Sequence, residues 1–135
     1  MPAPPGFREL TEASGFAAAN GPWFERIENG RAIRAFKAGP QHANSLGIVH
    51  GGMLAAFLDA AMGIAVWHAL RRRAVTMRLS LDFVGPGRVG DWLMAEGEVV
   101  GHDEHAAQVR GRLYGPRHEI LGGLGAFSLL SRQRR

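Results

Sequence analysis

The chain has 135 residues, of which 46% are hydrophobic and 21% are charged. This size and composition are typical of one compact domain and exclude two independent domains, wholesale disorder and a low-complexity fibre. The absence of cysteine excludes a disulfide scaffold, a cysteine-ligated metal and a thiol nucleophile, and it favours a reducing compartment. The net charge of +4 comes mostly from arginines that are spread along the chain, so we expect no nucleic-acid partner.

The N-terminal region predicts a cover over a single domain that spans residues 1–135. It has no basic stretch followed by an apolar run, so it does not predict a signal peptide, and we expect a cytoplasmic protein. Residues 6–19 predict a short helix that ends at Asn20-Gly21-Pro22. We therefore interpret residues 1–20 as the cover segment.

A hairpin is predicted next. Residues 23–28 and 31–37 carry strand-forming aromatic and branched side chains, and they flank Asn29-Gly30. This dipeptide supplies the two positive-φ positions of a type I′ turn, which joins antiparallel strands.

Residues 51–70 form the only long helical segment. Its apolar side chains run around the whole circumference, so we expect a helix that is buried on nearly every side. A membrane span has similar length and composition, but Asp59 would then lie at mid-depth at a cost of about 2.5–3.5 kcal/mol. We therefore expect no membrane.

Four strands are predicted after this helix. Residues 75–83 alternate perfectly between apolar and polar, with Thr76 on the face opposite Val75 and Leu79. Three further strand-like runs follow at residues 92–100, 106–114 and 120–130. Short turns join them, which favours an antiparallel meander packed on the helix.

His50-Gly51-Gly52 stands at the start of the long helix. A helix N-terminus presents free backbone N–H groups and a positive dipole end, and glycine lets a substrate oxygen approach them. The pattern is consistent with an oxyanion site, and equally with a loop break that lets the helix pack. His50 itself is a candidate base or a capping residue.

Asp59 lies about two turns into the same helix. Its helical neighbours at three and four residues are alanine, methionine and glycine, none of which pairs with a carboxylate. An unpaired, desolvated carboxylate suits a general base, whereas a structural aspartate would bond to the backbone.

Other catalytic patterns are weak. His102 and His105 lie in one turn without a third ligand, so no metal site is predicted. No Gly-x-Ser-x-Gly motif is present, and neither Ser45 nor Ser80 occupies a strand-to-helix turn. The residues imply no cofactor.

The segment from Asn44 to Asp59 resembles the signature of hotdog-fold acyl-CoA thioesterases of the PaaI (phenylacetyl-CoA thioesterase) type. An asparagine lies six residues before His50, the glycine pair follows the histidine, and an acid lies nine residues after it. Residues 76–86 resemble the strand that follows the helix in this family. The resemblance implies an α+β hotdog fold, with an antiparallel sheet wrapped around one long central helix.

The resemblance also implies roles for individual residues. Asp59 would be the general base or the nucleophile, and the Gly51 N–H would polarise the thioester carbonyl. Asn44 would position the attacking water or the sulfur side of the substrate. The family's sites form across a dimer interface, so Thr76, which is predicted to point away from its own core, would address the partner's site.

His50 and Gly52 would shape the loop and contact the substrate. The implied activity is hydrolysis of an acyl-CoA, of an aryl or phenylacetyl type, by a homodimer that pairs into a homotetramer. A non-catalytic acyl-CoA binding protein is the alternative. A hotdog dehydratase is a weaker one, because the helix lacks the His-plus-acid hydratase motif.

Overall fold

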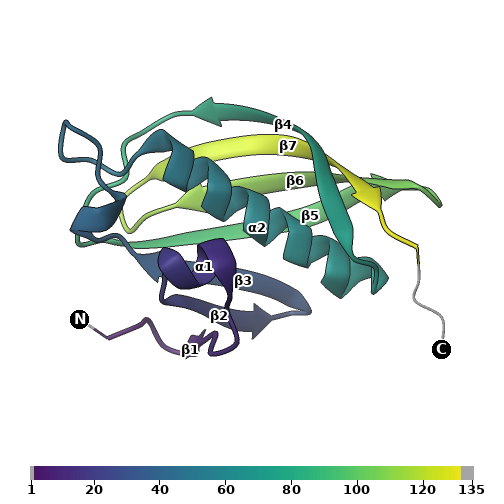
Figure 1. Ribbon diagram of the computed structural model, residues 1–135, viewed down its shortest axis with the longest axis horizontal. Coiled ribbons are helices and arrows are strands. Elements are labelled where there is room, and N and C mark those ends of the chain that lie inside the picture. Colours follow the sequence, from purple (N-terminus) through teal and green to yellow (C-terminus); the bar gives the residue numbers. More distant parts are fainter. Residues whose placement is uncertain (1, 132–135) are drawn as a thin grey trace.

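The computed structural model describes residues 2–131 and consists of one antiparallel sheet around a long helix (Figure 1). The seven strands follow the order β1-β2-β3-β5-β6-β7-β4. The predicted α+β hotdog fold is therefore confirmed. The elements are β1 (Arg8–Glu9), α1 (Gly15–Ala19), β2 (Trp23–Glu28), β3 (Arg31–Lys37), η1 (Pro40–His42), α2 (Gly51–Leu70), β4 (Ala74–Phe83), β5 (Trp92–His102), β6 (Ala106–Tyr114) and β7 (Glu119–Leu129).

The N-terminal segment differs from the predicted helix over residues 6–19. Arg8 and Glu9 instead pair with the free edge of β2, and the Leu10 N–H donates to the Trp23 carbonyl. Because this edge offers backbone partners, the chain extends along it, and the helix is limited to the five residues of α1. The segment lies beside β2 and β3, below α2 in Figure 1.

The hairpin of β2 and β3 is confirmed. Asn29 and Gly30 have φ values of 52° and 76°, as a type I′ turn requires. The register pairs Trp23 with Phe36. Both rings are buried and pack against Phe57 of α2, with centroid separations of 4.9 and 4.5 Å.

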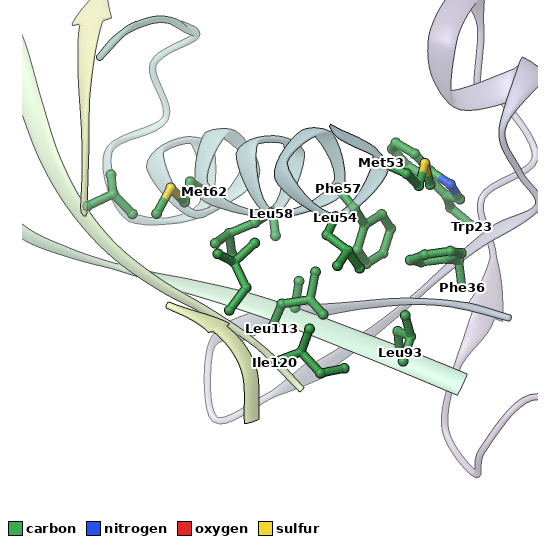
Figure 2. Close-up of a cluster of buried hydrophobic side chains, with 14 of the residues drawn as sticks. Trp23, Phe36, Met53, Leu54, Phe57, Leu58, Met62, Leu93, Leu113 and Ile120 are labelled. Carbon is green, nitrogen blue, oxygen red and sulfur yellow. The ribbon is translucent and has the colours of Figure 1, made fainter. Parts of the chain in front are cut away.

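The bounds of α2 agree with the prediction, but its burial does not. The sheet covers one face only, because its strands all lie on one side of the helix (Figure 1). In Figure 2, Leu54, Phe57 and Leu58 point from this face toward the sheet. The helix is long and apolar enough to cross a membrane by length and composition, and 44% of its apolar window is buried here.

Two glycines of the sheet allow α2 to approach closely. A Cβ at Gly97 would lie 3.1 Å from the Met62 Cα, and one at Gly111 would lie 2.6 Å from the Met62 Cε. These positions exclude larger side chains because the interior is close-packed. They fix the height of the helix above the sheet.

The predicted meander of four strands is wrong in one connection. β5, β6 and β7 form a meander, but β4 pairs with β7 and β5 pairs with β3. Residues 84–91 therefore cross from one side of the sheet to the other. Turn length alone does not identify a strand's neighbour, and this crossing leaves β4 at the edge.

Candidate active site

Asp59 and Thr76 meet on the flank of α2 that faces β4. The Thr76 Oγ1 donates to the Asp59 Oδ1 at 2.5 Å. Asp59 is half-buried, and no ion pair within residues 2–131 involves it. The carboxylate is thus oriented by a neutral hydroxyl and is left without a compensating charge.

A β-bulge at Met77 explains this contact. Thr76 pairs with Phe127 and Arg78 pairs with Ala126, so Met77 is an extra residue in β4. The bulge shifts the alternation by one position and places Thr76 on the helix-facing side, where Phe127 is buried. The prediction that Thr76 points away from its own core toward a partner's Asp59 is therefore wrong.

Asn44 shapes the loop before α2. Its Oδ1 accepts the backbone N–H of Leu46 at 2.9 Å and that of Ile48 at 3.4 Å, and its own N–H donates to the Ile48 carbonyl. These bonds occupy the carbonyl end of the side chain. The Nδ2 amide makes no hydrogen bond within the described residues 2–131, so it is free to donate.

His50 is the N-cap of α2. Its Nδ1 accepts the Gly52 N–H at 2.8 Å, so these two predicted substrate contacts are engaged with each other. The Gly51 N–H donates to no group within the part of the chain that the structure describes. It lies at the positive end of the helix dipole and is the amide best placed to stabilise an oxyanion.

Phe83 was not identified from the sequence as a site residue. A Cβ on Gly51 would lie 3.7 Å from the Phe83 Cε2, so this ring stands beside the helix N-terminus. It is 51% exposed. The apolar–polar alternation of β4 does not indicate this position, because the pattern does not distinguish Phe83 from the other four apolar residues of the strand.

The two parts of the site are far apart within one chain. Asp59 follows Gly51 by eight residues of helix, which is about 12 Å at 1.5 Å per residue. A thioester carbonyl must lie within hydrogen-bond distance of the amide while the carboxylate lies beside the same carbon. One chain alone therefore does not bring these groups to one substrate.

A trough of about 500 Å³ runs along the exposed face of α2, and Ala60, the residue after Asp59, lines it. Gly63, one turn beyond Asp59, lines it, and a Cβ at this position would meet nothing within 4 Å. Trp67 lies one turn further, with the Arg71 guanidinium 5.6 Å from its ring centroid. Arg34 and Arg73 also line the trough.

A larger cavity of about 720 Å³ lies between N-terminal residues and β2, and none of the predicted site residues lines it. No predicted site residue lines the trough either, but Ala60 and Gly63 bring it within about one helical turn of Asp59, so we take it as the relevant one.

The His102–His105 turn is a structural turn. The Asp103 Oδ1 accepts the backbone N–H groups of His105 and Ala106, and these bonds lower the pKa of Asp103. Within residues 2–131, no group of three histidine, aspartate or glutamate side chains comes together as a metal site would require.

Comparisons with known proteins identify the family. Residues 46–116 match the thioesterase superfamily. A Pseudomonas aeruginosa protein, whose name proposes that it is an esterase, is 32% identical over 132 residues, covering 96% of this chain and 98% of that protein. The chain belongs to the thioesterase superfamily.

Solved structures of similar proteins share the hotdog fold of this family. A Bacillus halodurans protein crystallised with CoA is 33% identical, has a TM-score of 0.67, and is matched over 72% of this chain and 70% of that one. The Escherichia coli PaaI protein, from the phenylacetic acid degradation operon, is 22% identical, with a TM-score of 0.77 over 85% and 83% of the two chains.

Proposed function

We propose that this protein hydrolyses an acyl-CoA thioester to the free acid and CoA, at sites that form between two copies of the chain. The observation that carries this proposal is the oriented carboxylate of Asp59, which forms no ion pair with any of residues 2–131. A protein that only binds acyl-CoA has no use for a carboxylate beside the carbonyl. Membership of the thioesterase superfamily and a relative crystallised with CoA support the same reaction.

The edge strand β4 supports the assembly. Its outer edge has no strand partner among residues 2–131, and Val75, Met77 and Phe83 are each more than half exposed. Proteins rarely leave such an apolar edge open. We expect two copies to join their β4 edges antiparallel about a two-fold axis.

This pairing would also complete the site. With the axis near the middle of β4, Thr76 of one copy faces Phe83 of the other. Asp59 of the first copy then lies near Gly51 of the second, because Thr76 bonds to Asp59 and Phe83 adjoins Gly51. The distance along α2 that separates the groups in one chain is thereby bridged.

The chemistry follows from these positions. Asp59 either removes a proton from water or attacks the carbonyl carbon itself, while the Gly51 N–H of the other copy stabilises the oxyanion. The C–S bond then breaks, the thiolate of CoA leaves and takes up a proton, and water supplies the second carboxylate oxygen of the acid. The Asn44 amide would hold the water or the thioester sulfur.

The finer part of the proposal is that the trough along α2 takes an aryl acyl group. Gly63 leaves open space one turn from the carboxylate, and Trp67 offers an aromatic wall for edge or stacked packing. We expect Gly63→Leu to lower kcat/KM for phenylacetyl-CoA by about tenfold, because the leucine side chain would fill the space that the aryl group occupies. The kcat/KM for acetyl-CoA should change little, because its acyl group does not reach that space.

The deciding experiment is thiol release from a panel of acyl-CoAs, read with a thiol reagent. Wild-type protein should turn over at least one member, and phenylacetyl-CoA should be preferred to acetyl-CoA. Tight binding of acyl-CoA without thiol release by a folded protein would favour the binding alternative instead. A monomeric mass by light scattering at micromolar concentration would contradict the shared site.

A further inference from the structure

His42 is a buried, titratable side chain that the proposed chemistry does not use. It is 3% exposed and lies at the end of η1, two residues before Asn44. Its Nδ1 accepts the Gly39 N–H at 3.0 Å, and its Nε2 lies 3.0 Å from the Asn20 carbonyl oxygen. A carbonyl only accepts and an amide N–H only donates, so the tautomer that satisfies both partners carries its proton on Nε2.

The imidazole joins two regions of the chain. Asn20 is the C-cap of α1, and its carbonyl also accepts the Trp23 Nε1–H at 3.1 Å. Gly39 begins the turn that leads into the loop carrying Asn44. The ring therefore attaches this loop to the N-terminal cover segment, across 22 residues of sequence.

The backbone of His42 is also linked to the start of α2, where the Gly51 amide lies. The His42 carbonyl accepts the His50 N–H at 2.8 Å, and His50 in turn holds the Gly52 N–H. The bridge between Ala43 and Val49 closes the loop between them. A shift of His42 would thus move both Asn44 and the start of α2.

Protonation would break this arrangement. A proton on Nδ1 would face the Gly39 N–H, placing two donors against each other in a buried site. The surroundings supply no counter-charge. Asn20, the C-cap of α1, presents a neutral carbonyl, Phe36 of β3 presents its ring at a centroid separation of 5.0 Å, and no ion pair within residues 2–131 involves His42.

We propose that His42 is a positioning residue of the thioester site: its neutral ring holds loop 43–50 so that Asn44 and the Gly51 amide meet the substrate, and protonation of the ring releases that loop. The inference rests on the proposed function for its kinetic readout. It also predicts that protonation of the His42 ring changes the environment of the Asn44 and Gly51 amides, which can be measured without any enzymatic activity.

The first test is a titration of the wild-type protein by NMR, with ¹⁵N-labelled histidine and backbone. At neutral pH the His42 ring should show an unprotonated Nδ1 and a protonated Nε2. On acidification, the amide signals of Asn44 and Gly51 should move together with the His42 ring signals. Amides that stay fixed while the ring titrates would overturn the proposal, as would the opposite tautomer.

The second test compares three variants by kcat and KM on the preferred acyl-CoA. His42→Phe keeps the ring packing but removes both hydrogen bonds, and kcat should fall about tenfold with KM within about twofold. His42→Asn keeps an acceptor near the Nδ1 position, so it should recover part of kcat. Its kcat should persist to lower pH than that of the wild type, because no imidazole remains to be protonated.

Ile33→Ala is the matched control. Ile33 is buried on the opposite side of the sheet, and its truncation lowers stability without touching loop 43–50. If His42→Phe, measured where it is fully folded, kept the same kcat as Ile33→Ala, the role would be structural only and the proposal would fail. If the wild type released no thiol from any acyl-CoA, the proposed function would fail, and the NMR coupling would still decide the role of His42.

Discussion

Two acidic side chains, Glu96 on the outer face of the sheet and Asp59 on α2, are held in opposite ways. On the outer face, Glu96 is buried and forms ion pairs with Arg31 at 3.2 Å and Arg112 at 3.4 Å. Its carboxylate also accepts a hydrogen bond from the Tyr114 hydroxyl at 3.1 Å. Arg112 also pairs with Glu119 at 2.9 Å. On the helix-facing side, the Thr76 hydroxyl is the only group among residues 2–131 that donates to the Asp59 carboxylate.

This difference predicts that Glu96 contributes to the stability of the fold and that Asp59 contributes to the reaction. Several donors hold a buried acid in one position, and removing any partner leaves the others uncompensated. A carboxylate with one neutral donor keeps its capacity to take a proton or attack a carbonyl. We therefore expect substitutions on the outer face to change stability and substitutions at Asp59 to change activity.

The largest effect is expected for Asp59→Asn. The amide keeps the shape but neither removes a proton nor attacks the carbonyl, so kcat should fall at least ~100-fold. The free energy of unfolding should change little, because no ion pair is lost. Activity assays with parallel chemical denaturation test this, and an active Asp59→Asn protein would contradict the assigned role.

Thr76→Val should have a smaller effect on activity. It removes one hydrogen bond to a charged group, worth about 1.5–3 kcal/mol, so kcat should fall roughly 10- to 100-fold. Thr76→Ser retains the hydroxyl and serves as the matched control. A folded Thr76→Val protein with the kcat of the wild type would contradict a role for the hydrogen bond.

Glu96→Gln should lower stability and leave activity unchanged, the opposite of the result expected for Asp59→Asn. Two arginines lose their buried partner, and the free energy of unfolding should fall by about 1–3 kcal/mol. The kcat of the folded protein should stay at the wild-type value, since this face lies across the sheet from Asp59. A large loss of kcat without loss of stability would contradict the distinction between Glu96 and Asp59.

Tyr114 gives the smallest and most specific effect. Burial, together with the charge and hydrogen bond of Glu96, raises its pKa from 10.0 to about 12. The unfolded chain ionises first, so the contribution of Tyr114 to stability is complete below pH 10 and is lost as pH rises toward 12. Ultraviolet titration should show late phenolate formation in the wild type and earlier formation in Glu96→Gln.

Local signals predicted much of the fold. Asn29-Gly30 required positive φ values and gave the hairpin, and the bounds of α2 follow from the loop before it and the arginines after it. The resemblance to hotdog-fold thioesterases gave the wrapped sheet. The edge position of β4 depends on which strand lies beside it, and turn length does not determine this.

The site was only partly predictable. The segment from Asn44 to Asp59 contains both halves of the proposed site, but the contact between Asp59 and Thr76 depends on the bulge at Met77. An alternating pattern carries no sign of an extra residue, so Thr76 was placed on the wrong face. His42 was overlooked because a histidine in a polar loop gives no indication that it is buried.

The most direct test of the shared site is complementation between two inactive variants. Asp59→Asn breaks the carboxylate half, and Asn44→Ala breaks the loop half. If the halves come from different copies, exchange of subunits gives heterodimers with one intact site, and a random mixture should recover about a quarter of wild-type activity per subunit. Mixing Asp59→Asn with Thr76→Val, which both lie in the carboxylate half, should give no such recovery. Recovery in the first mixture alone supports the account, whereas no recovery despite verified exchange would contradict it.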